Sequence, residues 1–322
     1  MQPKCIFEMG SRRYVIQNVH LDFKNKKILV MGLGLSGGGV GTAEFLQKHG
    51  AKVTVTDLRT PKDLAPSLKA LAKYQGIRYV LGRHRKDDFR SADLVIKNPG
   101  VRRDNPYLKA AQQYGVPVTS DLGIFFDLCP GRIIGITGTR GKSTATYLLW
   151  QMLKTKFPRT HYGGNIRRSV LSVLPKIKKG DPVVLELSSF QLMDLDAEDK
   201  SPSVAIITNI MPDHLNWHIS MREYRDSKTA IFRHQRSQKH SDIVHNVGMS
   251  GGTQNREDLV IIPAGDQVLE KMVRGAHSRL IRAALAPDMQ KVVDKNLGVH
   301  YRASAALAAE AAMALGVPHA AI

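Results

Sequence analysis

The chain has 322 residues, of which 43% are hydrophobic, enough for roughly two domains of ordinary size that each bury a core. Its formal net charge is +19, but the basic residues are scattered apart from a cluster at residues 233–240, and aromatic residues make up only 6%. Because nucleic-acid surfaces combine a basic stripe with aromatic stacking platforms, we expect no nucleic-acid partner. Cys5 and Cys129 are the only cysteines and no long apolar run occurs, so we expect a cytoplasmic protein without a disulfide framework or a membrane span.

The first part of the chain shows the pattern of alternating parallel strands and helices. Residues 26–60 predict a strand, a glycine turn, a helix and a second strand. Short apolar runs that are typical of buried parallel strands occur at residues 27–31, 53–57, 94–100 and 116–119. This pattern indicates a doubly wound α/β unit, and we assign residues 1–128 to a Rossmann-like domain.

A glycine-rich turn connects the first strand to the first helix. Gly32, Gly34 and Gly37 match the pattern G-x-G-x-x-G, and Asp57 ends the next strand. Glycines at this spacing let backbone N–H groups and the helix N-terminus approach a diphosphate, and NAD enzymes use such an acid to bind a ribose. Taken alone, the motif predicts an NAD-dependent oxidoreductase, and a tight turn without a ligand is the simpler alternative.

The second part of the chain begins after Pro130 and Gly131, which interrupt the pattern of strands and helices. Further buried-strand runs occur at residues 132–137, 182–188, 203–210 and 258–263, and an alanine-rich helix is expected at 303–318. Residues 233–296 give few other signals. We therefore predict a second α/β domain over residues 129–322, built around its own phosphate-binding loop.

The stretch GITGTRGKST, residues 135–144, is one glycine out of register with the general phosphate-binding pattern G-x-x-x-x-G-K-[ST]. Gly138 and Gly141 offer a nest of backbone N–H groups for phosphate oxygens. Lys142 supplies a positive charge for the β- and γ-phosphates, and Ser143 or Thr144 supplies a hydroxyl for Mg²⁺. We therefore expect this loop to bind a nucleoside triphosphate.

Side chains that could hold a metal follow two later strands. Glu186 ends one predicted strand, where P-loop proteins commonly place an acid for Mg²⁺, and Asp213 and His214 follow the next. His214 and His218 also have the spacing of half a zinc site, although no third ligand accompanies them. The interpretation that we favour places one histidine near the phosphates and leaves the other solvated or capping a helix.

Several motifs resemble, in this order, those of the Mur ligases, the ATP-dependent amide ligases that build the peptidoglycan stem peptide. They are GITGTRGKST (135–144), GGN (163–165), LELSSFQL (185–192), TNIMPDHLNWH (208–218) and YRDSK (224–228). The resemblance is strong over residues 26–232, and it is closest to the member that adds D-glutamate to UDP-N-acetylmuramoyl-L-alanine. It implies an acid–amino-acid ligase that uses ATP and Mg²⁺, acts through an acyl phosphate and takes those two compounds as substrates.

The resemblance assigns the first glycine loop to the diphosphate of a UDP-sugar in place of NAD. The implied UDP-sugar-binding residues are Gly34, Leu35, Ser36, Gly37, Asp57, Leu58, Arg59, Asn98 and Gly100. The implied ATP-binding residues are Gly138, Thr139, Arg140, Gly141, Lys142, Ser143, Thr144 and Asn209.

The resemblance also implies catalytic and metal-binding roles. The implied catalytic residues are Lys142, Asn165, His214 and Lys228, and the implied metal ligands are Ser143, Glu186, His214 and a carbamylated Lys228. Carbamylation is part of the assignment because an unmodified lysine would repel Mg²⁺. The simpler alternative for Lys228 is a solvated lysine on an amphipathic helix over residues 221–232.

Two features depart from the family pattern. Members carry the motif H-N-x-x-N near the start of the last helix of the ATPase domain, whereas here His300 is followed by Tyr301 and Ser304. Tyrosine cannot reproduce the paired donor and acceptor of a carboxamide. The resemblance also implies a third, C-terminal domain of about 100–150 residues that binds the incoming amino acid. We expect this domain to be absent and the chain to be a truncated ligase. The alternatives left open are a remnant that binds UDP-sugar and ATP without ligation, and the NAD-dependent oxidoreductase.

Overall fold

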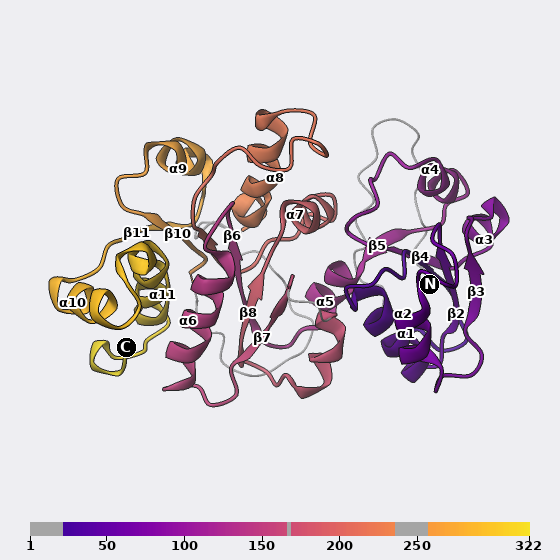
Figure 1. The fold of residues 1–322 in the computed structure, drawn as a ribbon, viewed down its shortest axis with the longest axis horizontal. Helices are drawn as coiled ribbons and strands as arrows, with labels where there is room; N and C mark the ends of the chain where they lie inside the picture. The colour runs from indigo at the N-terminus through magenta and orange to yellow at the C-terminus, as the bar shows by residue number, and fades with distance from the viewer. Residues whose placement is uncertain (1–21, 166–168, 236–256) are drawn as a thin grey trace, which may run out of the picture.

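A computed structural model describes residues 22–165, 169–235 and 257–322 of the chain, and it contains two parallel β-sheets with helices on both faces of each (Figure 1). The first sheet has five strands in the order β3-β2-β1-β4-β5. The second has six strands in the order β11-β10-β9-β6-β8-β7. The α/β fold expected from the sequence is therefore confirmed.

The first sheet is built from residues before position 121. Its strands are β1 (Lys27–Met31), β2 (Lys52–Asp57), β3 (Arg78–Leu81), β4 (Leu94–Lys97) and β5 (Val118–Ser120). The connecting helices are α1 (Gly38–Lys48), α2 (Ala65–Leu71), α3 (Lys86–Arg90) and α4 (Pro106–Gln113). Successive β1 side chains face opposite cores: Ile28 packs with α1, whereas Leu29 packs with α3 and α4. A continuous apolar run is the pattern that such a two-sided strand requires.

The second sheet surrounds β6. Its strands are β6 (Arg132–Thr137), β7 (His161–Gly164), β8 (Pro182–Glu186), β9 (Val204–Ile207), β10 (Leu259–Pro263) and β11 (Arg279–Ala283). Its helices are α6 (Lys142–Lys154), α7 (Ser189–Asp196), α8 (Met221–Arg233), α9 (Gln267–Met272), α10 (Pro287–Asn296) and α11 (Arg302–Ala314). The helices α6 and α11 share one core with β6, whereas α7 and α8 pack on the other face of the sheet.

Three strands were not anticipated from the sequence, and each lies at the edge of a sheet. They are β3, which ends the first sheet, and β7 and β11, which end the second. An edge strand is covered less completely than a central one, so it can carry charged residues and glycines in place of a continuous apolar run. The segments RYVL, HYGG and RLIRA show this composition.

The two sheets share one continuous apolar core. Helix α5 (Asp121–Leu128) follows the first sheet and contributes Leu122 and Phe125 to a core that also holds Leu192 of α7. At Gly41 of α1, an added Cβ would lie 2.5 Å from the Ser169 Cβ, so a glycine allows this close approach. The predicted domain boundary after residue 128 falls between the last strand of the first sheet and β6, and it stays a prediction.

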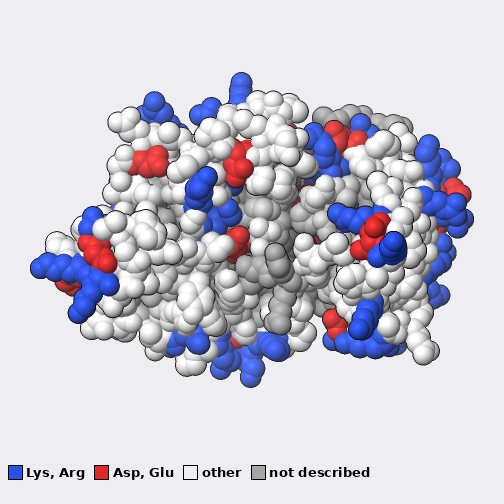
Figure 2. All heavy atoms as spheres, in the orientation of Figure 1, with Lys and Arg blue, Asp and Glu red and all other residues white. Residues whose placement is uncertain are grey.

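Charged residues are spread over the surface. On the face in Figure 2, Lys and Arg side chains form several separate groups with acidic residues between them. Residues 236–240 of the basic cluster lie outside the described part of the chain, as does Cys5. Among the described helices, none combines the length and the apolar composition needed to cross a membrane.

Candidate functional site

The second glycine loop joins β6 to α6 in a conformation that needs its glycines. Gly138 has φ of 146° and Gly141 has φ of 80°. A Cβ at Gly138 would lie 1.9 Å from Thr208 Oγ1, so no larger residue is accommodated there. The loop leads directly into the N-terminus of α6 at Lys142, which is the arrangement that presents backbone N–H groups to an anion.

Side chains that follow β9 hold this loop in place. Asn209 Oδ1 accepts a hydrogen bond from the Arg140 N–H at 3.0 Å, and its Nδ2 donates to the Arg140 carbonyl at 2.9 Å. Thr208 Oγ1 donates to the same carbonyl at 2.6 Å. These hydrogen bonds hold the backbone of the loop, and the predicted nucleotide-binding residue Asn209 acts on that backbone in this structure.

Oxygen ligands suited to Mg²⁺ meet at the start of α6. Ser143 Oγ donates to Glu186 Oε2 at 2.6 Å, and Glu186 is almost fully buried at the end of β8. Asn165 lies beside the same carboxylate, with its Nδ2 3.4 Å from Glu186 Oε1. A hydroxyl and a carboxylate side by side are the donor set that Mg²⁺ takes in phosphate-binding sites, so these residues fit the expected ion.

Lys142 lies over the glycine loop. Its Nζ donates to the Thr139 carbonyl at 2.9 Å. This position at the first turn of α6 leaves the amine beside the N–H groups of the loop, where a phosphate would replace the carbonyl as its partner.

Lys228 lies beneath the same loop. Its side chain is 1% exposed, and its Nζ donates to the Gly138 carbonyl at 2.9 Å and to Thr137 Oγ1 at 3.3 Å. The solvated-lysine alternative is therefore wrong. Burial, with repulsion from Lys142, lowers the pKa of Lys228 to about 7, and attraction to Asp213 opposes this only in part. Near neutral pH a large fraction of this amine is uncharged, which is the form that reacts with carbon dioxide.

The two histidines of the 208–218 motif occupy different environments. His214 is half exposed, and its Nε2 lies 3.6 Å from Asp213 Oδ2. His218 is buried: its Nε2 lies 3.0 Å from Ser189 Oγ, its Nδ1 lies 3.7 Å from Glu223 Oε2, and burial lowers its pKa. The expectation that the second histidine is solvated or caps a helix is therefore wrong. Over the described residues, no group of three or more His, Cys, Asp or Glu side chains is arranged to hold a metal, so the zinc alternative gains no support.

The first glycine loop is stabilised by a carboxylate. Asp57 Oδ2 accepts hydrogen bonds from the N–H groups of Leu33 and Gly34 at 2.9 and 3.0 Å, and its Oδ1 accepts one from the Arg59 N–H at 2.9 Å. One oxygen of Asp57 thus holds the first glycine loop, and the other holds the turn that follows β2.

Around this loop lie the other residues predicted to bind a UDP-sugar. Leu35 and Leu58 are large apolar side chains that are 56% and 64% exposed, and such side chains can pack against the face of a base or sugar ring. Asn98 Oδ1 accepts from the Gly100 N–H at 3.1 Å. A Cβ at Gly32 would lie 2.8 Å from the Asn98 Cβ, so the turn after β4 packs directly on the first glycine loop.

The departure from the family motif lies beside the second glycine loop. Ser304, near the start of α11, is buried, and its Oγ would lie 3.0 Å from a Cβ added at Gly141. Tyr301 ends the short helix η5 (Val299–Tyr301) and its ring packs against His300 at a centroid distance of 4.1 Å. Of the two replaced positions, Ser304 therefore lies beside the second glycine loop, whereas Tyr301 packs on its neighbour His300.

Several residues of the site were not found from the sequence. Thr208 and Tyr224 are two of them: Tyr224 is buried and its hydroxyl lies 3.1 Å from Thr139 Oγ1. The spacing of Tyr224 and Lys228 by four residues places both on one face of α8, and this was the available signal. The hydrogen bond from Thr208 depends on the path of the loop, for which the sequence offers no periodic pattern.

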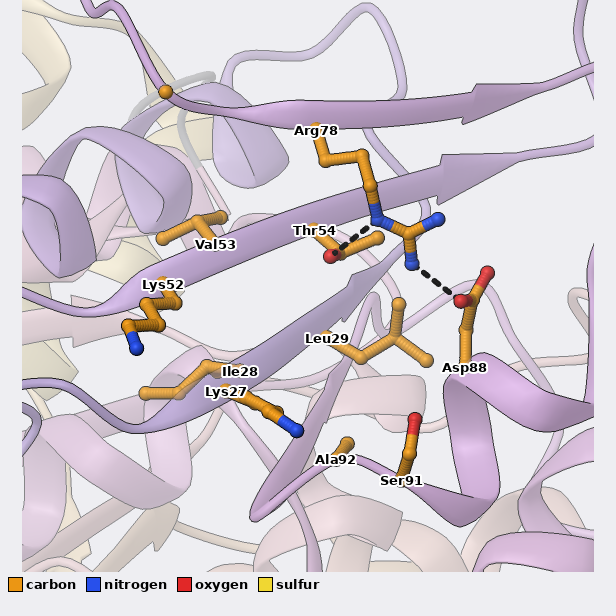
Figure 3. A pocket seen from close by; sticks show the side chains of 11 residues that line it. Lys27, Ile28, Leu29, Lys52, Val53, Thr54, Arg78, Asp88, Ser91 and Ala92 are labelled. Carbon is orange, nitrogen blue, oxygen red and sulfur yellow. Dashed lines mark hydrogen bonds and ion pairs between the residues drawn. The ribbon is translucent and has the colours of Figure 1, made fainter.

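A separate pocket opens beside strands of the first sheet (Figure 3). It has a volume of about 360 Å³ and is lined by Lys27, Ile28, Leu29, Lys52, Val53, Thr54, Gly76, Arg78, Asp88, Ser91 and Ala92. These residues include the first residues of β1, β2 and β3. In a parallel sheet the functional loops follow the carboxyl ends of the strands, so this pocket is not part of the site built around the glycine loops.

Comparison with known protein families matches both halves of the chain. Residues 26–120 match the model of the Mur ligase MurD-like N-terminal domain, and residues 136–250 match that of the Mur ligase middle domain. Together the two models cover more than half of the chain. The chain belongs to the Mur ligase family. The resemblance predicted from the motifs is thereby confirmed, and the oxidoreductase alternative gains no support from these matches.

Individual Mur ligases show how far the similarity extends. The UDP-N-acetylmuramoylalanine–D-glutamate ligase of Roseiflexus sp. (strain RS-1) is 52% identical over 216 residues, which are 67% of this chain and 46% of that protein. The ligase of the same name from Clostridium tetani is 34% identical over 268 residues, 83% of this chain and 53% of that protein. The chain therefore spans about half the length of the curated relatives it matches.

Solved structures support the fold. The UDP-N-acetylmuramate:L-alanyl-γ-D-glutamyl-meso-diaminopimelate ligase (MPL) from Neisseria meningitides aligns over 91% of this chain and 94% of that chain. Its TM-score is 0.58 and its sequence identity is 16%. A murein peptide ligase from Psychrobacter arcticus aligns over 92% of this chain and 67% of that chain, with a TM-score of 0.56 and 16% identity. At this identity the likeness concerns the fold alone.

Proposed function

We propose that this chain contributes the UDP-sugar-binding and ATP-binding parts of a ligase that adds D-glutamate to UDP-N-acetylmuramoyl-L-alanine. The observation that carries the proposal is the grouping of Ser143, Glu186 and the buried Lys228 around a nucleotide loop. This loop occurs in a chain whose other glycine loop belongs to a MurD-like domain. The relatives named for this activity support the choice of substrates.

The proposed reaction activates a carboxylate. The alanyl carboxylate of the UDP-sugar attacks the γ-phosphorus of ATP, which releases ADP and leaves an acyl phosphate. The amine of D-glutamate then attacks the acyl carbon, loses a proton and displaces phosphate to form the amide. Phosphoryl transfer of this kind depends on positioning and on charge stabilisation. Lys142 and the N–H groups of residues 138–143 would stabilise charge on the γ-phosphate, and Asn165 would lie near the group transferred.

Mg²⁺ would be held by the oxygens of Ser143 and Glu186, with His214 and a carbamylated Lys228 as further ligands. The ion, when bound, neutralises charge on the β- and γ-phosphates. The Lys228 amine, with its pKa lowered to about 7 by burial, can add to carbon dioxide and lose a proton. The product is a carbamate anion, which removes the repulsion between Lys228 and a nearby cation.

Binding measurements test the two sites separately. We expect calorimetry to detect binding of Mg·ATP and of UDP-N-acetylmuramoyl-L-alanine to the purified chain. Lys142→Ala should weaken Mg·ATP binding by about 10- to 100-fold, since a hydrogen bond between charged groups is lost, and should leave UDP-sugar binding unchanged. Lys154→Ala, at the opposite end of the same helix α6, is the matched control and should bind both ligands normally.

The reaction itself is tested with all three substrates present. Amide product and ADP that require ATP, the UDP-sugar and D-glutamate together support the ligase. Binding of NADH in place of the UDP-sugar would contradict the proposal and favour an oxidoreductase. Because ATP is an intracellular substrate, we propose that the protein acts in the cytoplasm.

A second candidate is a chain that binds both ligands without joining them. Ser304 beside Gly141 favours it, because a serine cannot reach a nucleotide as the family asparagine does. The same experiment separates the candidates: binding of UDP-sugar and Mg·ATP without amide product supports this second one.

A further inference from the structure

The turn that follows β4 reaches from the first sheet to the second through two adjacent arginines. Arg102 Nη1 donates to the Trp217 carbonyl at 2.8 Å, and its guanidinium lies 4.9 Å from the centre of the Trp217 ring. These residues are separated by 115 positions in the sequence. One side chain therefore contacts both the backbone and the ring of Trp217, an arrangement for which the planar guanidinium is suited.

The neighbouring arginine fixes the same turn to helix α7. Arg103 Nε donates to Asp194 Oδ1 and its Nη2 to the Asp194 carbonyl, each at 3.1 Å. Lys97, at the end of β4, donates to Asp194 Oδ2 at 2.5 Å, and both of these side chains are at most 2% exposed. Breaking a buried pair of this kind is strongly destabilising, so Asp194 holds the two sheets in one relative position.

The contact at Trp217 continues toward the nucleotide site. The ring of Trp217 lies edge-to-face on Phe190 at a centroid distance of 4.5 Å, and Phe190 lies 5.3 Å from the ring of His214. The backbone N–H of Trp217 also donates to the His214 carbonyl at 3.0 Å. The position of His214 is therefore determined by a turn whose far side is held by Arg102.

The turn after β4 also carries two of the residues that we propose to bind the UDP-sugar. They are Asn98 and Gly100, which lie four and two positions before Arg102. The Val101 N–H donates to the Asn98 carbonyl at 2.9 Å, which closes the turn into a short hydrogen-bonded unit. A ligand that orders Asn98 and Gly100 also fixes the direction in which Arg102 leaves the backbone.

We propose that Arg102 is a positioning residue that couples the two binding sites: occupation of the loop at Asn98–Gly100 by a UDP-sugar fixes the Trp217 turn and thereby places His214 for Mg·ATP. The inference rests on the proposed function, since it takes the ligands of the two sites from it. Thermodynamic linkage requires the effect to be reciprocal, so Mg·ATP should tighten UDP-sugar binding by the same factor.

The test measures Mg·ATP affinity by calorimetry with and without saturating UDP-N-acetylmuramoyl-L-alanine. In the unaltered chain we expect the UDP-sugar to tighten Mg·ATP binding by at least about fivefold, the lower end of ordinary coupling. Arg102→Ala should bind Mg·ATP alone within about twofold of the unaltered chain but should lose this enhancement. Arg102→Lys, which keeps the charge without the planar fork, should recover only part of it. Arg102 is suited to this test because its side chain is 39% exposed, so that its removal leaves the buried Lys97–Asp194 pair intact.

Arg90→Ala is the matched control. Arg90 also lies over an aromatic ring, that of Tyr114 at 4.7 Å, and pairs with Asp87 at 3.6 Å, but all these residues belong to the first sheet and its helices. This variant should retain the full enhancement. A loss of the enhancement in Arg90→Ala as large as that in Arg102→Ala would overturn the specific role of Arg102.

Fluorescence gives a second measurement at the proposed contact. The chain has two tryptophans, so Trp150→Phe leaves Trp217 as the single emitting indole. We expect UDP-sugar to change the emission of Trp217 in this background and to have no such effect when Arg102→Ala is added. If both ligands bind and the affinity of neither depends on the other, the coupling is wrong while the proposed function stands. If the unaltered chain does not bind the UDP-sugar at all, the proposed function fails first.

Discussion

The two glycine loops of this chain have the same frame of strand, turn and helix, but they are held in different ways. In the first loop, the carboxylate of Asp57 accepts hydrogen bonds from the N–H groups of Leu33 and Gly34. In the second, the Asn209 amide and the Thr208 hydroxyl hold the backbone of Arg140. The second loop also carries Lys142 and the pair of Ser143 and Glu186 at the start of its helix.

The different side chains around the two loops indicate a different function for each loop. A diphosphate that is only held in place can be recognised by backbone N–H groups and a helix N-terminus. A phosphoryl group that is transferred develops charge that must be stabilised by cations and metal ligands. The carboxylate of Asp57 behind the first loop is compatible with holding a diphosphate. The lysine, hydroxyl and carboxylate at the second loop suit the transfer of a phosphoryl group.

The largest expected effect concerns Gly138 of the second loop, compared with Gly38 in helix α1, directly after the first loop. Gly138→Ala adds a Cβ 1.9 Å from Thr208 Oγ1 at a residue with φ of 146°. We expect a loss of about 4 kcal/mol in the free energy of unfolding, from the sum of backbone strain and overpacking. Gly38→Ala, in the first turn of α1, meets nothing within 4 Å, and it should change the free energy of unfolding by less than about 1 kcal/mol, in the stabilising direction.

Urea unfolding of the two variants without ligands measures this contrast. Equal destabilisation by both substitutions would show that the cost does not arise from the enclosure of Gly138. A Gly138→Ala variant of unchanged stability would contradict the packing of Thr208 against the loop.

Asp57→Ala gives the next largest effect. It removes the acceptor for two backbone N–H groups of the first loop, and we expect a loss of about 3 kcal/mol because each unpaired buried donor costs about 1–3 kcal/mol. UDP-sugar binding should weaken with it, while Mg·ATP binding at the second loop is retained. Asp57→Asn keeps one acceptor oxygen and should lose less. Calorimetry with each ligand measures the selectivity, and an equal loss at both loops would contradict the separate support of the two.

Much of the frame could be predicted from the sequence, because buried parallel strands leave continuous apolar runs and their carboxyl ends meet at one edge. This placed Glu186 and the loop at Ser143 near each other, and they lie in hydrogen-bond contact. The edge strands β3, β7 and β11 were not predicted, because a strand that is only partly covered by neighbouring elements does not need a continuous apolar run.

Contacts that join distant segments were not predictable from periodicity. Lys228 lies on an amphipathic helix where a lysine is expected in solvent, and its burial follows from the approach of the glycine loop above it. Arg102 and Trp217 are brought together by the arrangement of the two sheets, for which a single sequence contains no local signal. His218 belongs to the same class, since its burial depends on Phe190 and Tyr224 from separate helices.

Per pH unit, Lys228 gives the smallest contrast, but it is the most specific one because it concerns a pH dependence that the first loop does not share. Burial lowers its pKa from 10.5 to about 7 in the folded chain. Between these values the unfolded chain binds more protons than the folded chain, so stability must rise with pH, by up to about 1.4 kcal/mol per pH unit. Below pH 7 both states carry the proton and the destabilisation is present in full.

Lys228→Met should therefore remove this rise of stability with pH, whereas Lys154→Met, at an exposed site on α6, should retain it. Urea unfolding from pH 6 to 9.5 in buffer free of carbon dioxide measures the slopes. Equal slopes in the unaltered chain and Lys228→Met would mean that Lys228 remains charged beneath the loop, and the amine would then lack the uncharged form that carbamylation requires.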